Sequence, residues 1–150
     1  MTDIREYLAR KPLLFDGGMG TYYKAAPGAD CEMANLTDPE GVKKVHAEYL
    51  AAGAQAIKTN TFGLPRMAAA QMPGWEELAE AGWKLACDAA AEKGAAVFAD
   101  LGPALDTEAA PASSAYGLVA QQFAALGAKN FLFETLSSDV GIVEAVKALR

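Results

Sequence analysis

The fold is decided by residues 53–62, which read GAQAIKTNTF. Gly53 can take the left-handed conformation in which helices commonly end, and the apolar run after it is typical of a buried strand. The pattern returns at residues 94–100, which read GAAVFAD, and at residues 127–135, which read GAKNFLFET. The sequence therefore predicts that a helix ends at Gly-Ala and a strand begins at each of these places.

Apolar residues recur with the helical period between these repeats, which indicates helices packed by one face. The stripes are Leu78, Leu85, Ala86 and Ala89 in one helix, Tyr116, Val119, Phe123 and Leu126 in the next, and Val140, Val143, Val146 and Leu149 in the last. Near the start, residues 13–16 read LLFD and are halted by GGMG at 17–20, which predicts a first buried strand and a tight loop. Alternation of apolar strands with helices implies a parallel sheet covered by helices, with four strands in this chain.

Two architectures could hold these units, a doubly wound sheet or a closed barrel. A dinucleotide-binding sheet requires G-x-G-x-x-G to open a helix directly, whereas a long polar segment follows GGMG at 17–20. The barrel is favoured, and because a complete (β/α)8 barrel needs about 250 residues, four units make about half of one. We therefore expect residues 1–150 to be the amino-terminal part of an α/β domain of the parallel (β/α)8 TIM-barrel type. Its first and last strands would be open edges, covered by a missing carboxyl-terminal half, a second copy or a partner.

Two further helices are expected before the first repeat. Asp3 and Glu6 are spaced as in a capping box, and the short helix that they begin would cover one end of the barrel. A longer helix ends at Gly53 and is capped either by Asp38 or by a capping box that opens at Thr37.

Composition excludes several classes of partner. The net charge is −6 and the pI is near 4.8, and Lys and Arg do not cluster, so nucleic acid is not expected as a partner. The first residues are charged where a signal peptide is apolar, and charges interrupt the longest alanine-rich stretch, so neither export nor membrane insertion is expected. Two distant cysteines, Cys31 and Cys87, do not make a disulfide framework, which favours a reducing compartment and a cytoplasmic location.

Each predicted strand ends in a polar side chain, and in barrels the active site lies at the carboxyl ends of the strands. The residues are Asp16, Asn60 with Thr59 and Thr61, Asp100, and Glu134. Helix capping and loop hydrogen bonds are an alternative role for any one of them. Because a cluster of carboxylates repels phosphate and attracts cations, the glycines are not expected to cradle a nucleotide. The site should prefer a group such as an α-ammonium, which points to an amino-acid substrate.

Five segments, in order, resemble motifs of the homocysteine S-methyltransferase family. They are LFDGGMGT at 14–21, EMANL at 32–36, the stretch from His46 to Gly53 with KTNTFG at 58–63, DLGP at 100–103 and FETL at 133–136. The resemblance spans nearly the whole chain, and its opening stretch is most similar to the bacterial form that is fused to a methylenetetrahydrofolate reductase. It implies a zinc-dependent (β/α)8 barrel that methylates the thiol of homocysteine to give methionine.

The resemblance also implies roles for the site residues. The substrate-binding set would be Asp16, Gly17, Gly18, Asn60, Thr61 and Glu134. The two carboxylates would hold the ammonium group of homocysteine, the two glycines would let the backbone approach its carboxylate, and the last two polar residues would line the pocket. None of them would transfer the methyl group, because zinc binds the substrate as a thiolate, the species that attacks. The methyl donor of such enzymes is a corrinoid-bound or folate-derived methyl group, S-methylmethionine or betaine.

The zinc ligands of the family are three cysteines on later strands, and this chain ends before them. Cys31 and Cys87 are expected to lie apart and to be incidental thiols rather than substitutes. His46, the single histidine, lies in a predicted helix beside Val42 and Val45 and is expected to pack rather than to bind metal. The sequence therefore predicts that this chain alone holds no metal site and is inactive.

Alternative functions follow from the same residues. The half barrel could be a non-catalytic binding or assembly module that self-associates through its open edges. A different barrel enzyme, with carboxylates as acid and base, would show raised carboxyl pKa values and activity without zinc. The loop at 104–113, at the mouth of the barrel, would either close on substrate or be a solvated connection.

Overall fold

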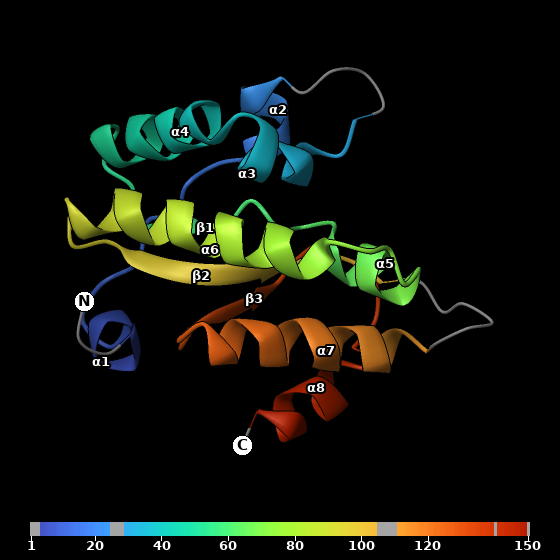
Figure 1. Ribbon diagram of the computed structural model, residues 1–150. Helices are drawn as coiled ribbons and strands as arrows, with labels where there is room; N and C mark the ends of the chain where they lie inside the picture. The colour runs from blue at the N-terminus through green and yellow to red at the C-terminus, as the bar shows by residue number, and fades with distance from the viewer. Residues whose placement is uncertain (1–3, 25–28, 105–110, 140, 150) are drawn as a thin grey trace.

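The computed structural model describes residues 4–24, 29–104, 111–139 and 141–149. The predicted cap residue Asp3, Val140 of the last apolar stripe, and residues 105–110 of the predicted mouth loop lie outside the described residues. The helices are α1 (Ile4–Leu8), α2 (Met19–Tyr23), α3 (Ala34–Thr37), α4 (Pro39–Ala51), α5 (Leu64–Ala69), α6 (Trp75–Ala91), α7 (Ala112–Ala125) and α8 (Ile142–Ala148), with a 3-10 turn η1 (Cys31–Met33) (Figure 1). The strands are β1 (Ala56–Lys58), β2 (Ala96–Leu101) and β3 (Phe131–Phe133). Within the described ranges, no helix has the length and apolar character needed to span a membrane.

The strands form a parallel sheet in the order β1-β2-β3. Ala56 pairs with Ala96 between β1 and β2, and Ala99 pairs with Phe131 between β2 and β3. Strands that are consecutive in sequence are therefore neighbours in space, as in a (β/α) barrel. The architecture is α/β with a parallel sheet, consistent with part of such a barrel.

The predicted first strand at 13–16 is reduced to a single bridge. Phe15 pairs in parallel with Ala56, and the backbone N–H of Asp16 donates to the Ala56 carbonyl at 3.0 Å. Pro12 lacks a backbone N–H, and glycines follow Asp16 at once, so too few residues remain for a longer ladder. In the described residues a bridge thus replaces the first strand, and the expected half barrel of four complete strand-helix units is not confirmed.

Two short helices form where the sequence predicts none. The predicted tight loop at residues 17–20 already enters α2, which begins at Met19, and the connection after β1 folds into α5. Pro65 stands in the first turn of α5, where its missing N–H leaves no hydrogen bond unmade. The buried carboxylate of Glu32 accepts the N–H of Gly63 at 2.5 Å just before this helix. Because this helix start depends on a residue distant in sequence, the local pattern does not reveal it.

The helix before the first repeat, α4, is capped by Asp38. Asp38 Oδ1 accepts the N–H of Gly41 at 3.1 Å, whereas the Thr37 hydroxyl donates to the Met33 carbonyl at 3.0 Å. Of the two predicted caps, Asp38 is the one that is used. The chain turns away after this helix at Gly53, with a φ of +106° that favours glycine.

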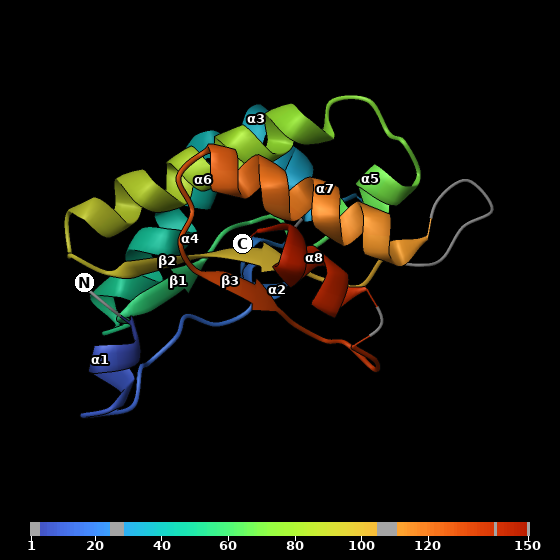
Figure 2. The same cartoon turned by 90° about the horizontal axis from the view of Figure 1, so that it is seen from below.

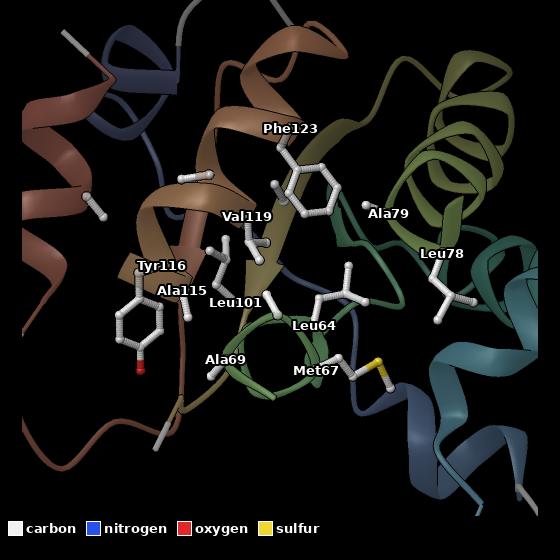
Figure 3. Close-up of a cluster of buried hydrophobic side chains, with 14 of the residues drawn as sticks. Leu64, Met67, Ala69, Leu78, Ala79, Leu101, Ala115, Tyr116, Val119 and Phe123 are labelled. Atoms are coloured by element: carbon white, nitrogen blue, oxygen red, sulfur yellow. The ribbon is translucent and has the colours of Figure 1, made fainter. Parts of the chain in front are cut away.

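Helices α6 and α7 cover one face of the sheet (Figures 1 and 2). The largest cluster of buried side chains lies there, with Leu101 of β2 packed among Leu64 of α5 and Val119 and Phe123 of α7 (Figure 3). The fully buried Phe123 ring stands edge-on to Trp83 of α6, with centroids 6.1 Å apart. This layer fixes the strands from the helix side.

The opposite face of the sheet, called the inner face below, carries a smaller apolar cluster. Ala56 and Phe98 are buried there, and Ile4 of α1 and Phe15 pack against them. The rings of Phe15 and Phe98 have centroids 4.8 Å apart. Because side chains alternate along a strand, Asp100 follows Phe98 on the inner face, close to the end of β2.

Candidate substrate pocket

A cavity of 310 Å³ opens at the carboxyl ends of the strands. Its walls come from the loop after Phe15, from η1, and from the residues at the ends of the three strands. All of the substrate-binding residues expected from the sequence line this cavity: Asp16, Gly17, Gly18, Asn60, Thr61 and Glu134. Lys58, Thr59 and Asp100 line it as well. The strand ends thus bring distant segments of the chain to one polar pocket.

Asp16 stands at the side of the pocket next to β1. Its Oδ2 accepts a hydrogen bond from the backbone N–H of Lys58 at 3.1 Å. Its Oδ1 is buried and has no hydrogen-bond partner in the described part of the chain. Burial raises the pKa of Asp16 to about 6, although the backbone hydrogen bond and the charge of Lys58 lower it. The pocket therefore holds a carboxyl oxygen that is free to accept.

Lys58 and Glu134 form an ion pair in the pocket. Lys58 Nζ donates to Glu134 Oε2 at 3.0 Å, and the two side chains are 17% and 29% exposed. Burial lowers the pKa of Lys58, but the hydrogen bond and charge of Glu134, with the charges of Asp100 and Asp16, outweigh it and raise that pKa. Lys58 therefore carries a positive charge into a pocket lined by several carboxyl groups.

Asp100 is the most buried of these carboxyl groups, with 3% of its surface exposed. Its Oδ1 lacks a hydrogen-bond partner among the described residues. Burial, and then the charge of Glu134, raise the pKa of Asp100 to about 8, while the charge of Lys58 lowers it. At neutral pH the Asp100 carboxyl group is consequently largely protonated in the free pocket.

Two hydroxyl groups join the end of β1 to β2. Thr61 Oγ1 donates to the Asp100 carbonyl at 2.9 Å and lies 2.5 Å from Thr59 Oγ1. Because Thr61 uses its one hydroxyl proton on that carbonyl, Thr59 donates to Thr61, and Thr59 also accepts the N–H of Asp100 at 3.0 Å. Both threonines are buried, so they shape the wall of the pocket and leave no free hydroxyl proton for a ligand.

Asn60 is likewise held by protein groups. Its Nδ2 donates to the Cys31 carbonyl and to Asn35 Oδ1, each at 2.9 Å. Asn35 Nδ2 donates back to the Asn60 carbonyl at 2.8 Å. This pair ties the end of β1 to η1 and α3, so the Asn60 amide also has a shaping role.

The two glycines at the start of the pocket have different neighbours. A Cβ on Gly17 would lie 2.6 Å from Tyr49 Oη, whereas a Cβ on Gly18 would lie 3.1 Å from Thr21 Oγ1. Tyr49 Oη also donates to the Gly18 carbonyl at 3.3 Å. The packing of α4 against this loop therefore requires a glycine at position 17.

The residues that the structure describes do not fit a zinc site. Among the described residues, no three His, Cys, Asp or Glu side chains are grouped so that they could hold a metal ion. Cys31 lines the pocket, but burial and then the charge of Glu32 raise the pKa of its thiol, which disfavours a zinc-binding thiolate. Cys87 lies in α6 and does not line the pocket. His46 in α4 is fully buried, and burial lowers its pKa to about 4.

Lys58 is absent from the site that the sequence predicts, whereas Asp100 is among the predicted polar strand ends and is absent only from the substrate-binding set that the resemblance implies. The rule that polar strand ends face the mouth of a barrel points to Asp100, and a charge that ends an otherwise apolar strand is the signal for Lys58. The pairing of Lys58 with Glu134 crosses the sheet from β1 to the residue after β3. Such a pairing follows from the strand order and not from local sequence.

A parallel sheet with helices on its outer face and a polar pocket at its carboxyl edge is consistent with part of a protein of the (β/α)-barrel class. The sequence model that describes homocysteine S-methyltransferases matches residues 13–149. The chain belongs to the homocysteine S-methyltransferase family.

Two methionine synthases are similar in sequence to part of this chain. Methionine synthase from Mycobacterium tuberculosis is 36% identical over 72 residues, which cover 41% of this chain and 6% of that protein. Methionine synthase from Mycobacterium leprae is 35% identical over 72 residues, with the same two coverages. These sequences are much longer than the present chain.

Solved structures share the fold. The metallated form of the homocysteine methyltransferase MmuM from Escherichia coli matches with a TM-score of 0.71 and 20% identity, over 97% of this chain and 62% of that one. The oxidized form of MmuM matches with a TM-score of 0.73 and 21% identity, over 97% of this chain and 61% of that one. The chain thus spans less than two thirds of the length of these proteins.

Proposed function

We propose that the pocket binds homocysteine, and that the chain is the amino-terminal, substrate-binding part of a zinc-dependent homocysteine S-methyltransferase. The observation that supports this proposal is the meeting of Asp16, Asp100 and Glu134 at one cavity, in a chain of this family. The cavity of 310 Å³ lies within the usual range of small-molecule sites, about 300 to 1,000 Å³. Carboxyl groups around such a cavity favour a ligand that carries an ammonium group.

In this proposal the ammonium group of homocysteine binds between Asp16 and Glu134. Asp16 contributes its buried and unpartnered Oδ1. Glu134 already accepts an ammonium group, that of Lys58, at 3.0 Å, so its carboxylate is suitably oriented for such a ligand. A bound ammonium would lower the pKa of Asp16 and hold that group ionised, which strengthens the hydrogen bonds.

The carboxylate of homocysteine would lie along the backbone at Gly17 and Gly18. A side chain at position 18 would stand against Thr21, so glycine keeps this approach open. Asn60 and Thr61 would define the shape of the pocket, because their donors are committed to protein acceptors. The chain therefore supplies groups that bind and orient the substrate.

This family uses zinc, which when bound would hold the thiol of the substrate as a thiolate. The described residues of this chain do not fit a zinc site, so we assign them no part in thiol activation. The metal and the corrinoid or folate methyl donor would be bound by a carboxyl-terminal half. Methionine formation would therefore require that half in addition to this chain.

The same half would cover the open edges of the sheet. Leu14, beside the bridge at Phe15, is 58% exposed, and Leu132 on the inner face of β3 is only partly buried. A missing half of the barrel or a second copy would bury these groups. The solution mass distinguishes a monomer from the self-associating, non-catalytic module that is the alternative function.

Carboxylate acid-base chemistry is a second candidate, because the raised pKa values of Asp16 and Asp100 are what it predicts. Burial is the main cause of both shifts, and burial also accompanies a binding role. Two measurements in zinc-free buffer separate the homocysteine-binding candidate from the acid-base candidate: the affinity for homocysteine and an assay for catalysis. Turnover of a substrate without zinc would favour the acid-base enzyme.

Isothermal titration calorimetry with homocysteine tests the proposed function. We expect saturable binding, weakened about tenfold or more by Asp16→Asn and by Glu134→Gln, because each removes a partly buried charge that faces the ammonium group. The matched control is Asp88→Asn, which removes a carboxylate that pairs with Lys84 on the surface of α6. Circular dichroism should show that all three variants keep the fold. Equal affinity in the wild type and both pocket variants would refute the assignment of these carboxylates.

A further inference from the structure

Lys58 occupies the carboxylate that the ammonium group of the substrate has to reach. Its Nζ lies 3.0 Å from Glu134 Oε2, and both side chains are partly buried. A lysine ammonium and an α-ammonium have the same charge and the same donor chemistry. The two groups therefore compete for Glu134 Oε2, and a ligand ammonium that takes the same position on this oxygen displaces Lys58.

The strand order places Asp100 between the partners of this ion pair. Lys58 ends β1, Asp100 lies in β2, and Glu134 follows β3, in a sheet ordered β1-β2-β3. Lys58 pairs in register with Phe98, so Asp100 is the next inner-face residue toward the pocket on the adjacent strand. A Lys58 side chain that reaches Glu134 consequently crosses the strand that carries Asp100.

Asp100 has the properties of an alternative acceptor for Lys58. Only 3% of the residue is exposed, and Asp100 lines the cavity. Oδ1 has no hydrogen-bond partner in the described ranges, which is unfavourable for a buried oxygen. Lys58 lines the same cavity from β1, the strand that pairs with β2. A displaced Lys58 ammonium would satisfy this oxygen.

We propose that Lys58 is an internal competitor of the substrate, which holds Glu134 in the free pocket and moves to Asp100 when the ammonium group of a ligand takes its place. The inference rests on the proposed function, because it concerns the same pocket and the same ammonium group. A ligand without an ammonium group does not compete with Lys58 for Glu134. Lys58 therefore lowers the affinity for an α-amino acid and leaves that for the corresponding simple acid unchanged.

The test measures the affinity of two ligands for four proteins by calorimetry. The ligands are homocysteine and mercaptobutanoate, which has the same thiol and carboxylate but no ammonium group. The proteins are the wild type, Lys58→Met, Asp100→Asn and the double variant. The matched controls are Lys84→Met and Asp88→Asn, which break a lysine-carboxylate pair of 2.6 Å on the surface of α6. The controls should leave both affinities unchanged, and circular dichroism checks that every variant is folded.

The expected pattern is opposite in sign for the two single variants. Lys58→Met should tighten homocysteine binding about tenfold, because the internal competitor is gone, and should not tighten mercaptobutanoate binding. Asp100→Asn should weaken homocysteine binding about tenfold in the wild-type background, because the displaced Lys58 then meets a neutral amide in place of a carboxyl group that can ionise. In the Lys58→Met background the same change should have an effect of about twofold or less, so the two sites are coupled.

Several results would overturn the inference. Weaker homocysteine binding by Lys58→Met would mean that Lys58 binds the substrate directly, for example at its carboxylate. Equal tightening of both ligands would mean that the ammonium group is not what Lys58 competes with. An equal effect of Asp100→Asn in both backgrounds would remove the coupling. A wild type that binds no homocysteine refutes the proposed function as well, whereas wild-type binding with unaltered variants refutes this inference alone.

Discussion

Replacing Asp100 with asparagine should stabilise the protein at neutral pH. Asp100 is 3% exposed, its Oδ1 has no hydrogen-bond partner within the described residues, and burial raises its pKa from 3.8 to about 8. Between these two pH values the folded chain holds a proton that the unfolded chain has released. The unfolded state therefore binds fewer protons, and the free energy of unfolding falls as the pH rises through this window.

The magnitude follows from the size of the window. A difference of one bound proton changes the free energy of unfolding by about 1.4 kcal/mol per pH unit. Between pH 5 and pH 7, both inside the window, the wild type should lose about 2 to 3 kcal/mol through Asp100. Asparagine does not ionise, so the stability of Asp100→Asn relative to the wild type should increase by that amount over the same interval. Other groups, such as Asp16, titrate in both proteins and largely cancel in the comparison.

Urea unfolding followed by circular dichroism at pH 5, 6 and 7 measures this difference. The control is Asp88→Asn, an exposed carboxylate whose replacement should leave the pH dependence of the wild type unchanged. An advantage of Asp100→Asn that stays constant or shrinks as the pH rises would show that Asp100 is already ionised at pH 5. The account of a protonated carboxyl group in the pocket would then be wrong.

Four further outcomes are expected. Phe123→Ala should lower the free energy of unfolding by about 3 to 5 kcal/mol in urea melts, because the ring is fully buried; a loss under 1 kcal/mol would contradict its place in the core. Gly17→Ala should cost about 1 to 3 kcal/mol, because the new Cβ would lie 2.6 Å from Tyr49 Oη, and adding Tyr49→Phe should recover part of that loss. Burial lowers the pKa of His46 from 6.5 to about 4, so the unfolded state binds more protons and wild-type stability should fall as the pH drops through this range; His46→Leu should flatten that fall. Metal analysis after incubation with zinc and homocysteine and then desalting should find well under one zinc per chain, and stoichiometric zinc would show that the described residues do not account for the metal ligands.

Much of the architecture could be predicted because hydrophobic periodicity is a local property of the chain. The repeated Gly-Ala junctions precede β1, β2 and β3, and the apolar stripes between them lie in helices α6 and α7. The prediction of a first strand is wrong in extent, because the segment that ends at Phe15 pairs with its neighbour at one residue only. Helix α5 is missed because its start is stabilised by the buried carboxylate of Glu32, which is distant in sequence.

The candidate site also has features that the local sequence predicts and features that only the packing of the fold determines. The position of Asp16, Asn60 and Glu134 after apolar runs is enough to place them at the ends of strands, and they do line one cavity. That the Asn60 amide is committed to Asn35 is not visible in the sequence, since it depends on how α3 packs against the end of β1.

The sequence by itself determined the alternation of strands and helices and the polar strand ends, because each depends on residues that are close along the chain. Only the tertiary structure decided that Lys58 pairs with Glu134 and that Asp100 is buried beside them. The strength of a charge interaction depends on distance and on exclusion of water, and both are set when separate strands become neighbours. The sequence therefore predicts which kinds of polar residue reach the pocket, whereas the fold determines how those residues pair and which of them hold a proton.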